Sequence, residues 1–322
     1  MGTVPGTKNP RCGGDSLYII AYFWKMEKVN IENDYRKSGE GANGDSYDCL
    51  TDESIMLKMY NAGYPEHMIT DELEVARKVY SLGIPSPEPG CLVTDGSRLG
   101  IRYRRIAGKR SFARMISDEP DRMEEYTREF ARYCKTLHST PVPEGLFPDA
   151  REQARHFLEC DKVFSAAEKA FMQDFIDLIP DTGTAVHGDM HVGNVISTLP
   201  EGAPLSQEHT VNFIDLGLFS RGCPLLDMGM FQIVCFFSDE DFRRENYHLT
   251  GLQTRAMWDI FVDEYFYSDD CAAEKWFGPG ATPQAVFEGI LPYTCLKIFL
   301  IEHNAGALFP HYENIIRQTF GF

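Results

Sequence analysis

Residues 185–217 constrain the fold more than any other part of this 322-residue chain. They include two short apolar segments, residues 195–196 and 211–214, with the β-branched and aromatic content of strands. The interval between these segments contains two prolines and a glycine, which predicts a turn. We therefore expect an antiparallel hairpin.

Three polar side chains flank the two predicted strands. Asp189 and Asn194 stand just before the first strand, and Asp215 stands just after the second. An antiparallel pair brings these positions to the same end. Two carboxylates and an amide there are suited to holding a divalent metal and orienting a hydroxyl group, which is what phosphoryl transfer requires of a protein.

The composition indicates a globular chain. Apolar residues make up 43% and aromatic residues 12% of the sequence, enough for one large core or two modest ones, and we expect two lobes. The net charge of −17 repels phosphate backbones and anionic lipid, so we expect neither nucleic acid nor a membrane surface as partner. The charge favours a cationic substrate; an acidic protein whose charge carries no functional message is the alternative.

The cysteines and the longest apolar run bear on the compartment. Nine cysteines without a Cys-x-x-Cys pair form neither a disulfide framework nor a zinc motif, and indicate free thiols in a reducing compartment. The longest apolar run, residues 17–24, is shorter than the roughly 20 residues that span a bilayer and is a poor signal peptide. We predict a cytoplasmic protein. Its oligomeric state is left open.

We divide the chain into three parts. Residues 1–26 are expected to be a flexible extension, or a mis-started segment if Met26 is the true start. Residues 27–106 are expected to form a nucleotide-binding lobe, and residues 107–322 a helical lobe that carries the catalytic and substrate-binding groups.

Gly39, Gly41 and Gly44 form a Gly-x-Gly-x-x-Gly pattern, which is weak by itself. A Rossmann site requires a strand before the pattern and a helix after it. Here the pattern is followed by strand-like residues 46–50, a turn and strand-like residues 55–59. We therefore expect the glycines to form a hairpin loop that covers the phosphates of a nucleotide.

Lys58 lies in the second of these strands between apolar residues, which places its ammonium over the inner face of the sheet. Without the glycine loop it would be an ordinary strand lysine. Thr70 predicts the N-cap of a helix that extends to Tyr80, with acids in its first turn. Glu72 and Glu74 are both candidates to pair with Lys58; for each, a favourable charge at the helix N-terminus is the alternative.

The remaining pattern predicts a further hairpin and then mostly helices. Residues 91–103 read as a hairpin around an Asp-Gly turn, and the chain is expected to cross to the second lobe near Ile106. Apolar spacing and capping signals predict helices. Their approximate ranges are 121–138, 165–179, 225–237, 258–267 and 293–301.

Three motifs occur in a fixed order: His187-Gly-Asp189-Met-His-Val-Gly-Asn194, then Asp215-Leu-Gly, then Asp227-Met-Gly. Together with the glycine loop, they resemble the aminoglycoside phosphotransferase and choline kinase group, which are small-molecule kinases. The resemblance covers about residues 31–240. It implies an α+β, bilobal, protein-kinase-like fold with a small β-rich N-lobe and a larger, mostly helical C-lobe.

The resemblance also implies roles for individual residues. Asp189 would accept or orient the substrate hydroxyl, and Asn194 and Asp215 would hold Mg²⁺. Lys58 would contact the α- and β-phosphates of ATP or GTP, with Glu72 positioning it.

The same resemblance implies further nucleotide contacts and support for the loop. His187 and Asp227 would support the catalytic loop, with Asp227 accepting hydrogen bonds from buried backbone. The residues implied to bind the nucleotide, besides Lys58 and Glu72, are Gly39, Gly41, Gly44, Tyr103, Arg104 and Ile106.

Some positions depart from the protein kinase pattern. Gly188 replaces an arginine, as in the small-molecule branch, and Ser46 replaces an apolar residue. Arg104 and its neighbour Arg105 are unusually charged for this part of a kinase. Only residues 216–226 separate Asp215 from Asp227, too few for a peptide-binding activation loop. We therefore predict a phosphotransferase with an alcohol group of a small molecule as acceptor, such as an aminoglycoside-like compound, an amino alcohol or a sugar.

Two other functional classes are considered. His187, Asp189 and His191 have the alternation of a metal-dependent hydrolase site, although the other histidines show no partner motif. A catalytically inactive kinase fold that serves as a binding module is the second, and nothing in the sequence favours it. Acids of the C-lobe are candidates to bind amino groups of the acceptor or form a solvated face: Asp239, Glu240, Asp241, Asp259, Asp263, Glu264, Asp269 and Asp270.

Overall fold

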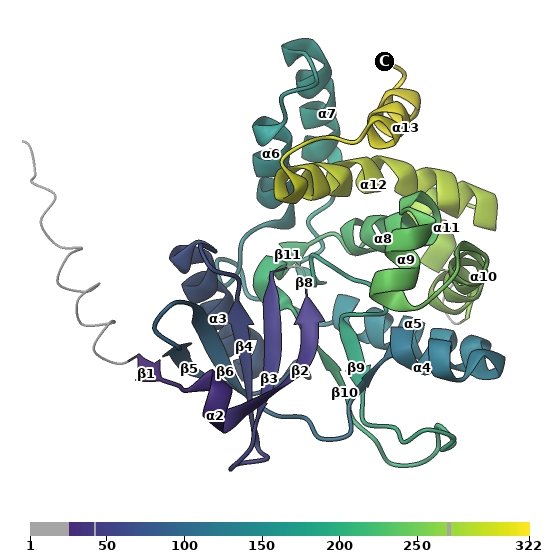
Figure 1. Ribbon diagram of the computed structural model, residues 1–322. Helices are drawn as coiled ribbons and strands as arrows, with labels where there is room; N and C mark the ends of the chain where they lie inside the picture. The colour runs from purple at the N-terminus through teal and green to yellow at the C-terminus, as the bar shows by residue number, and fades with distance from the viewer. Residues whose placement is uncertain (1–25, 42, 269–271) are drawn as a thin grey trace, which may run out of the picture. The chain divides into compact units, whose positions relative to one another are not determined.

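The computed structural model describes residues 26–41, 43–268 and 272–322 (Figure 1). Contacts divide the chain into two compact units. The first consists of the described residues up to Leu73 together with Pro89–Arg105, and the second of Glu74–Glu88 and Ile106–Phe322. Apart from Met26, the predicted extension over residues 1–26 lies outside the described residues.

The first unit is built on a six-stranded sheet. β5 (Pro89–Thr94) and β6 (Leu99–Arg104) form the second predicted hairpin. β1 pairs with β5 in parallel, and the other neighbours are antiparallel. In sheet order the strands are β1 (Glu27–Lys28), β5, β6, β4 (Ile55–Tyr60), β3 (Gly44–Cys49) and β2 (Tyr35–Gly41). A short helix, α2 (Ile31–Asp34), precedes β2.

The glycine-rich segment is the hairpin between β2 and β3, as predicted, and no helix follows it. Gly41 lies opposite Gly44, and the strand register shifts between Lys37 and Gly39. A Cβ atom on Gly44 would lie 2.7 Å from the Cα of Tyr60 on β4, which is closer than side-chain carbons approach backbone. Glycine is therefore required at position 44 for β3 to pair closely with β4.

The helix between β4 and β5, α3 (Glu66–Ser81), begins four residues before the predicted start at Thr70. Thr70 does not cap the helix, because its hydroxyl donates instead to the carbonyl oxygen of His67 at 2.8 Å. Ser and Thr side chains inside a helix commonly return such a bond to the preceding turn. Ile69 is buried, so the apolar face of the helix extends further toward the N-terminus than the sequence pattern indicated.

The second unit has a core of helices. Phe130, Phe231 and Phe261 pack with tilted rings whose centroids lie 4.7–5.6 Å apart, and they join three of these helices. The core helices are α4 (Phe112–Asp118), α5 (Met123–His138), α8 (Leu225–Gln232), α10 (Gly251–Val262) and α12 (Pro283–Ala305). α8 and α10 each continue into one π-helical turn, η3 (Ile233–Phe237) and η4 (Asp263–Tyr267).

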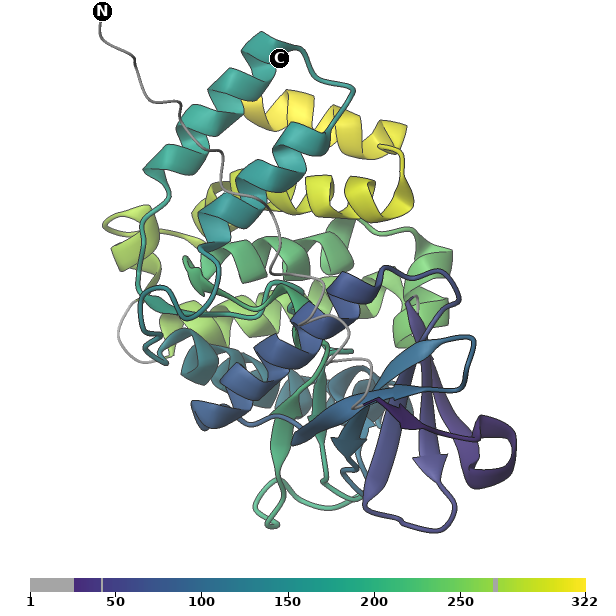
Figure 2. The same ribbon diagram turned by 90° about the vertical axis from the view of Figure 1, so that its left-hand side faces the viewer.

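Further helices pack against this core. Figure 2 shows α12 and α13 beside the hairpin of α6 and α7, and α12 contacts both α6 and α13. Ser165 and Glu168 form the predicted capping box at the start of α7. These outer helices are α6 (Ala150–Cys160), α7 (Ala166–Leu178), α9 (Glu240–Tyr247), α11 (Ala272–Phe277) and α13 (Pro310–Phe320).

α12 is much longer than the helix predicted over residues 293–301. The predicted helix begins after Pro292, whereas in the structure Pro292 lies inside α12. A proline removes one helical hydrogen bond and usually marks a helix end, but here the residues Tyr293 to Leu300 that follow are all buried. By length and composition alone α12 could cross a membrane, yet 56% of its most apolar window is buried inside the protein. A core helix has these same properties.

Short strands of the second unit carry the segment 185–217. β9 (Val195–Ser197) and β10 (Val211–Phe213) form the predicted antiparallel hairpin, with Val195 opposite Phe213. β7 (Arg110–Ser111) extends this pair to three strands. A second pair, β8 (Thr184–Val186) with β11 (Ser220–Gly222), brackets the hairpin in sequence.

The glycine hairpin offers a matched pair of substitutions. Gly44→Ala is expected to lower the free energy of unfolding of the first unit by roughly 1–3 kcal/mol, because its methyl group overlaps the backbone of β4. Gly39→Ala should change it by less than about 0.5 kcal/mol, since its Cβ would lie 3.6 Å from the Cβ of Ser46, an ordinary contact. Urea unfolding followed by circular dichroism compares the two. Equal stability of both variants would contradict the close pairing of β3 with β4.

Candidate active site

The loop between β8 and β9 brings Asp189 and Asn194 together. The side-chain amide of Asn194 donates to the backbone carbonyl of Asp189 at 2.9 Å and to its Oδ2 at 3.2 Å. The backbone N–H of Asn194 also donates to the carbonyl of His191 at 2.9 Å, which closes the turn. The carboxylate of Asp189 is thereby held by a residue five positions further along the chain.

Asp215 follows β10 at the same end of the hairpin. The backbone N–H of Ile214 donates to the carbonyl of Asn194 at 2.9 Å, so the next residue, Asp215, leaves the hairpin beside the end of the loop. Asp215 has φ 62° and ψ 54°, the left-handed conformation, which costs a residue other than glycine about 1 kcal/mol. Strain of this kind concentrates at functional sites.

Asp227, at the start of α8, is fully buried beneath the loop. Its carboxylate accepts the backbone N–H of His187 at 2.7 Å and that of Gly188 at 2.8 Å. Its Oδ2 also lies 3.0 Å from Nε2 of His138. Burial alone would raise the pKa of Asp227, but the hydrogen bond from His138, with the charge of Lys297, keeps the pKa below its ordinary value. The carboxylate is therefore ionised and supports the loop from below.

The rings of His187 and His191 contact the loop itself and residues that pack against it. Nε2 of His187 lies 2.9 Å from the carbonyl oxygen of Ile214, and its Nδ1 accepts the N–H of Asp189 at 3.3 Å. Burial lowers the pKa of His187, so the ring is neutral. His191 accepts the N–H of Gly193 at 3.0 Å and packs against the ring of Tyr247.

These contacts argue against the metal-dependent hydrolase. Both ring nitrogens of His187 are used for hydrogen bonds, so neither is available to a metal. Within residues 26–41, 43–268 and 272–322 there is no group of three or more His, Cys, Asp or Glu side chains that could hold a metal ion.

Gly188 explains why this loop has a glycine where protein kinases have arginine. Its φ is +90°, and a Cβ atom there would lie 2.6 Å from the Cβ of Leu218. A side chain at this position is excluded by both the backbone conformation and the space.

Two residues of the first unit form the predicted ion pair. Nζ of Lys58 lies 2.8 Å from Oε1 of Glu72, and both side chains are largely buried. Glu74, the other candidate, is exposed. Lys58 also lies 5.1 Å from the centre of the Tyr60 ring, and in the register of the sheet it faces Ser46, the polar residue that departs from the kinase pattern.

Residues 103–106, where the chain was predicted to cross to the second lobe, differ in burial and in their contacts. Tyr103 is buried in β6, and Arg104 ends that strand and is exposed. Nε of Arg105 lies 3.0 Å from Oδ2 of Asp48, and its backbone N–H donates to Ser54. The unusual charge of Arg105 is thus used inside the first unit, and the chain returns to the second unit at Ile106. The nucleotide contacts of Tyr103, Arg104 and Ile106, like those of the three loop glycines, stay predictions.

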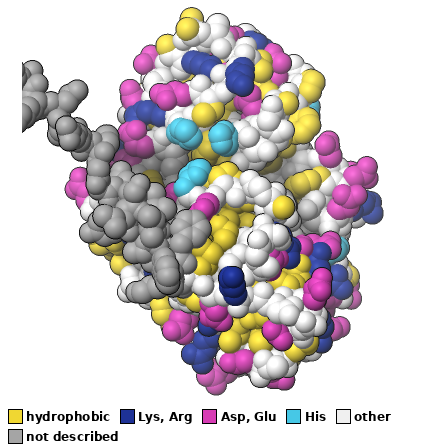
Figure 3. All heavy atoms as spheres, turned by 60° about the vertical axis from the view of Figure 1, so that its left-hand side comes forward, with side chains coloured by type: hydrophobic (Ala, Val, Ile, Leu, Met, Phe, Trp, Pro, Cys, Tyr) yellow, Lys and Arg dark blue, Asp and Glu magenta, His cyan; other side chains and the backbone are white. Residues whose placement is uncertain are grey.

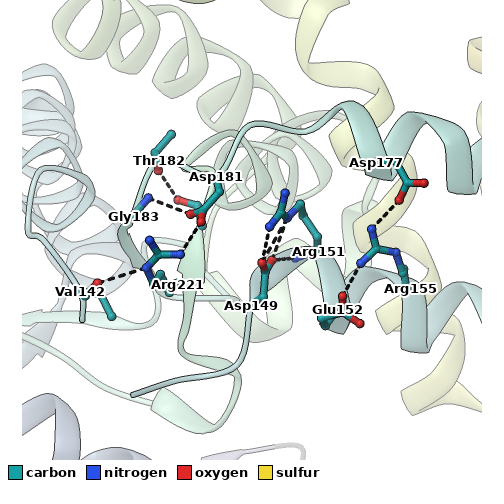
Figure 4. Close-up of polar contacts among 11 residues, drawn as sticks. Val142, Asp149, Arg151, Glu152, Arg155, Asp177, Asp181, Thr182, Gly183 and Arg221 are labelled. Atoms are coloured by element: carbon teal, nitrogen blue, oxygen red, sulfur yellow. Dashed lines mark hydrogen bonds and ion pairs between the residues drawn. The ribbon is translucent and has the colours of Figure 1, made fainter. Parts of the chain in front are cut away.

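Ion pairs around β8 and β11 fix the entry to the loop (Figure 4). The guanidinium of Arg221 on β11 donates to the carbonyl oxygen of Val142 at 3.1 Å and pairs with Asp181. Asp181 in turn accepts the backbone N–H of Gly183 at 2.9 Å, at the start of β8. These contacts hold the strand that leads into His187.

Two residues beneath the loop were not predicted from the sequence. Lys297 on α12 donates from Nζ to the carbonyl oxygen of Gly188 at 2.6 Å. Tyr265 contacts Nδ1 of His138 at 2.8 Å and so orients the ring that pairs with Asp227. Neither belongs to a motif. Lys297 is the one charged residue among residues 289–301, and this isolated charge in an apolar helix is the signal that could have identified it.

Several acids predicted to bind a cationic acceptor are engaged in ion pairs instead. Glu264 pairs with Arg128 and Arg132, and Asp263 pairs with Arg128. Glu240 pairs with Arg244. On the face shown in Figure 3, acidic side chains are scattered rather than gathered in one patch. Asp269 and Asp270 lie outside the described residues.

Asp259 and Asp263 both border a hollow of about 440 Å³ between α10 and α12, and none of the residues predicted for catalysis, nucleotide or metal lines it. It is also lined by Phe236, Trp258 and Phe287.

A strained aspartate at the end of the hairpin, a second aspartate held by an asparagine five residues later, and a buried Lys–Glu pair in a β-rich unit are features of kinase-like phosphotransferases. The sequence matches the phosphotransferase enzyme family over residues 34–260, more than half of the chain. The chain therefore belongs to the phosphotransferase enzyme family. This confirms the predicted enzyme class, a phosphotransferase that acts on an alcohol group of a small molecule.

Solved structures with the same fold share little sequence with this chain. The type VIII aminoglycoside-3'-phosphotransferase has 17% identity and a TM-score of 0.51, covering 80% of this chain and 91% of that one. A ternary complex of the aminoglycoside phosphotransferase APH(4)-Ia with ADP and hygromycin B has 14% identity and a TM-score of 0.51, with 95% and 98% covered. The complex of APH(2")-IIa with streptomycin and ATP has 16% identity and a TM-score of 0.51, with 97% and 98% covered.

These structures confirm the predicted α+β, bilobal, protein-kinase-like fold class. A comparison of the sequence with curated proteins finds no match.

The buried carboxylate beneath the loop generates a prediction about stability. Asp227→Asn is expected to lower the free energy of unfolding by about 3 kcal/mol at neutral pH, because an amide cannot accept all three hydrogen bonds and removes a paired buried charge. The exposed Glu74→Gln is the control and should change it by less than about 0.5 kcal/mol.

The stability difference between wild type and Asp227→Asn is expected to depend on pH. The folded-state pKa of Asp227 lies below the ordinary value of 3.8, so its contribution is complete above about pH 5 and is lost as the pH falls through the folded-state pKa. Thermal melts of wild type and Asp227→Asn between pH 3 and pH 7 measure the difference. A difference that does not shrink in acid would contradict an ionised Asp227.

Proposed function

We propose that the enzyme transfers the γ-phosphate of ATP to a hydroxyl group of a small, positively charged molecule. The observation that carries this proposal is the hydrogen bonding of Asn194 to Asp189 beside Asp215, which supplies a fixed carboxylate next to oxygen ligands. The nucleotide in the solved complexes of two fold relatives supports ATP as donor, since one contains ADP and the other ATP.

Asp189 is the residue proposed to act on the acceptor. Its carboxylate would accept a hydrogen bond from the acceptor hydroxyl and direct the oxygen in line with the γ-phosphorus, and it would take the proton as the bond to phosphorus forms. The amide of Asn194 keeps the carboxylate in one orientation before the acceptor arrives. Such preorganisation lowers the entropic part of the barrier.

The residues at the end of the hairpin fit magnesium. Because the nitrogen of the Asn194 side chain is engaged by Asp189, its Oδ1 is the atom left to serve as a ligand. With a carboxylate oxygen of Asp215, it makes the small all-oxygen set that Mg²⁺ accepts from proteins when phosphates and water complete its shell. Magnesium, when bound, would neutralise negative charge on the phosphates.

Lys58 is proposed to contact the α- and β-phosphates. Glu72 holds its ammonium at 2.8 Å in a largely buried position, so the side chain does not have to be ordered when the nucleotide binds. The glycine hairpin of β2 and β3 would supply backbone N–H groups to the phosphates.

A positive charge on the acceptor is supported by the net charge of −17, which raises the local concentration of cations at the protein surface. The aminoglycosides in the complexes of two fold relatives, hygromycin B and streptomycin, support a polyhydroxylated acceptor. For location, we propose the cytoplasm, because all cysteines in the described part of the chain are free thiols.

Asp189→Asn is expected to reduce phosphoryl transfer by at least about 10²-fold, because the amide cannot accept the proton. The Kd for ATP should change by less than about twofold, since Asp189 acts on the acceptor. Turnover is measured by ADP release against amino sugars, amino alcohols, sugars and nucleosides, and ATP binding by titration calorimetry. Transfer by the variant at the wild-type rate would refute the role of Asp189.

Glu72 and Glu74 provide a matched pair on one helix. Glu72→Gln is expected to lower kcat/KM for ATP by about 10-fold, because Lys58 loses a charged partner in a site that is largely buried. Glu74→Gln should leave it unchanged, since this side chain is exposed. Steady-state kinetics with ATP as the varied substrate compares them. Equal values for both variants would remove Glu72 from the nucleotide site.

A further inference from the structure

A lysine from α12 reaches the backbone of the catalytic loop. Nζ of Lys297 donates to the carbonyl oxygen of Gly188 at 2.6 Å, and this carbonyl belongs to the peptide bond that joins Gly188 to Asp189. On the N-terminal side of the same turn, Asp227 accepts the N–H groups of His187 and Gly188. The backbone that leads into Asp189 is thus held by an anion at its donors and by a cation at its acceptor.

Burying an ammonium group in this place is costly. Lys297 is 9% exposed and its neighbours in α12, Leu296 and Ile298, are buried and apolar. Burial lowers the pKa of Lys297, while the carboxylates of Asp227 and Asp189 act in the opposite direction. Taking an ion out of water costs several kcal/mol, which pairing seldom repays in full. Methionine has nearly the same length and shape and avoids this cost, so packing does not explain a lysine here.

What lysine supplies and methionine cannot is a charged donor for the carbonyl of Gly188. Gly188 has the left-handed φ of +90°, in which the backbone turns sharply between His187 and Asp189. Without a donor its buried carbonyl would be unsatisfied, and the peptide would gain by rotating toward water. Rotation of that peptide would turn the N–H of Asp189 away from Nδ1 of His187, to which it donates at 3.3 Å, and so loosen the residue whose carboxylate Asn194 contacts.

We propose that Lys297 is a positioning residue for phosphoryl transfer, holding the Gly188–Asp189 peptide so that the Asp189 carboxylate meets the acceptor hydroxyl in the productive direction. This rests on the proposed function of Asp189. Lys297 lies beyond the residues 34–260 that match the family, so the family match does not include it.

The first test is Lys297→Met in the full chain. We expect kcat to fall about 10- to 100-fold, because a displacement of about 1 Å at a catalytic group costs that much. KM for ATP should change by less than about twofold, since the nucleotide contacts are elsewhere. The melting temperature is expected to fall as well, because the carbonyl of Gly188 loses its donor and Asp227 loses a nearby positive charge. A purely structural lysine would also lower the melting temperature but would leave kcat unchanged, so kcat decides between the two roles.

Thr294→Val is the matched control on the same helix. Thr294 is also buried, but its hydroxyl contacts Gln232 and Gly229 on α8, not the loop. This variant should lower the melting temperature and leave kcat within about twofold of wild type. If Lys297→Met retains kcat within twofold as well, the positioning role is refuted.

Chemical rescue separates the charge from the volume of the side chain. Lys297 lines a small crevice together with Gln153, Phe157 and Leu300, and Lys297→Ala would enlarge the space there. Propylammonium should restore at least about a tenth of the lost kcat of this variant, whereas 1-propanol should not. Equal rescue by both compounds would show that filling space is sufficient and would overturn the proposal.

Hydrogen exchange distinguishes failure of this inference from failure of the proposed function. If wild type phosphorylates no acceptor in the screen, the proposed function fails, and exchange measured without substrate decides the inference. Faster exchange of the amides of residues 187–189 in Lys297→Met than in Thr294→Val supports positioning of the loop. Equal exchange in the two variants overturns it.

Discussion

The buried carboxylate of Asp227 is the interaction on which the arrangement of the catalytic loop depends. It stands at the start of α8 and accepts hydrogen bonds from two consecutive backbone N–H groups, those of His187 and Gly188. A carboxylate is the only side chain that can take both bonds and a third from His138 without presenting a donor of its own. The loop is therefore fixed by the core of the second unit, and this permits the left-handed turn at Gly188 that precedes Asp189.

The groups that surround this carboxylate come from two separate helices. His138 at the end of α5 approaches Asp227 directly, and Lys297 on α12 approaches the carbonyl of Gly188. The buried carboxylate and the buried ammonium would each be costly alone, because desolvation of an ion exceeds what one hydrogen bond returns. Asp227 and Lys297 bind the same turn of backbone: the carboxylate accepts the N–H groups of His187 and Gly188, and the ammonium donates to the carbonyl of Gly188. These buried charges lie next to Asp189, where the position of one carboxylate is proposed to decide the chemistry. Such an arrangement is expected for a preorganised site.

The sequence was sufficient for features that depend on local pattern. The hairpin of residues 185–217, the placement of Asp189, Asn194 and Asp215 at its end, and the glycine hairpin all follow from strand alternation and turn residues over short distances. It could not choose between Glu72 and Glu74, because both lie in the first turns of the expected helix, and only the rotation of α3 relative to β4 makes Glu72 the partner. Pattern also failed where burial overrides local preference, as at Pro292 inside α12.

Lys297 makes a contact that local sequence patterns cannot predict. Its contact with Gly188 joins residues 109 positions apart, and no periodicity or motif encodes a contact of that separation. What the sequence does contain is a single charge in an apolar helix, a local conflict between propensity and burial. Such conflicts in a folded chain are offset elsewhere, and functional sites are where proteins retain them. The long-range partner of an isolated buried charge is therefore a place to look for function that motifs do not mark, and here that partner is the peptide next to Asp189.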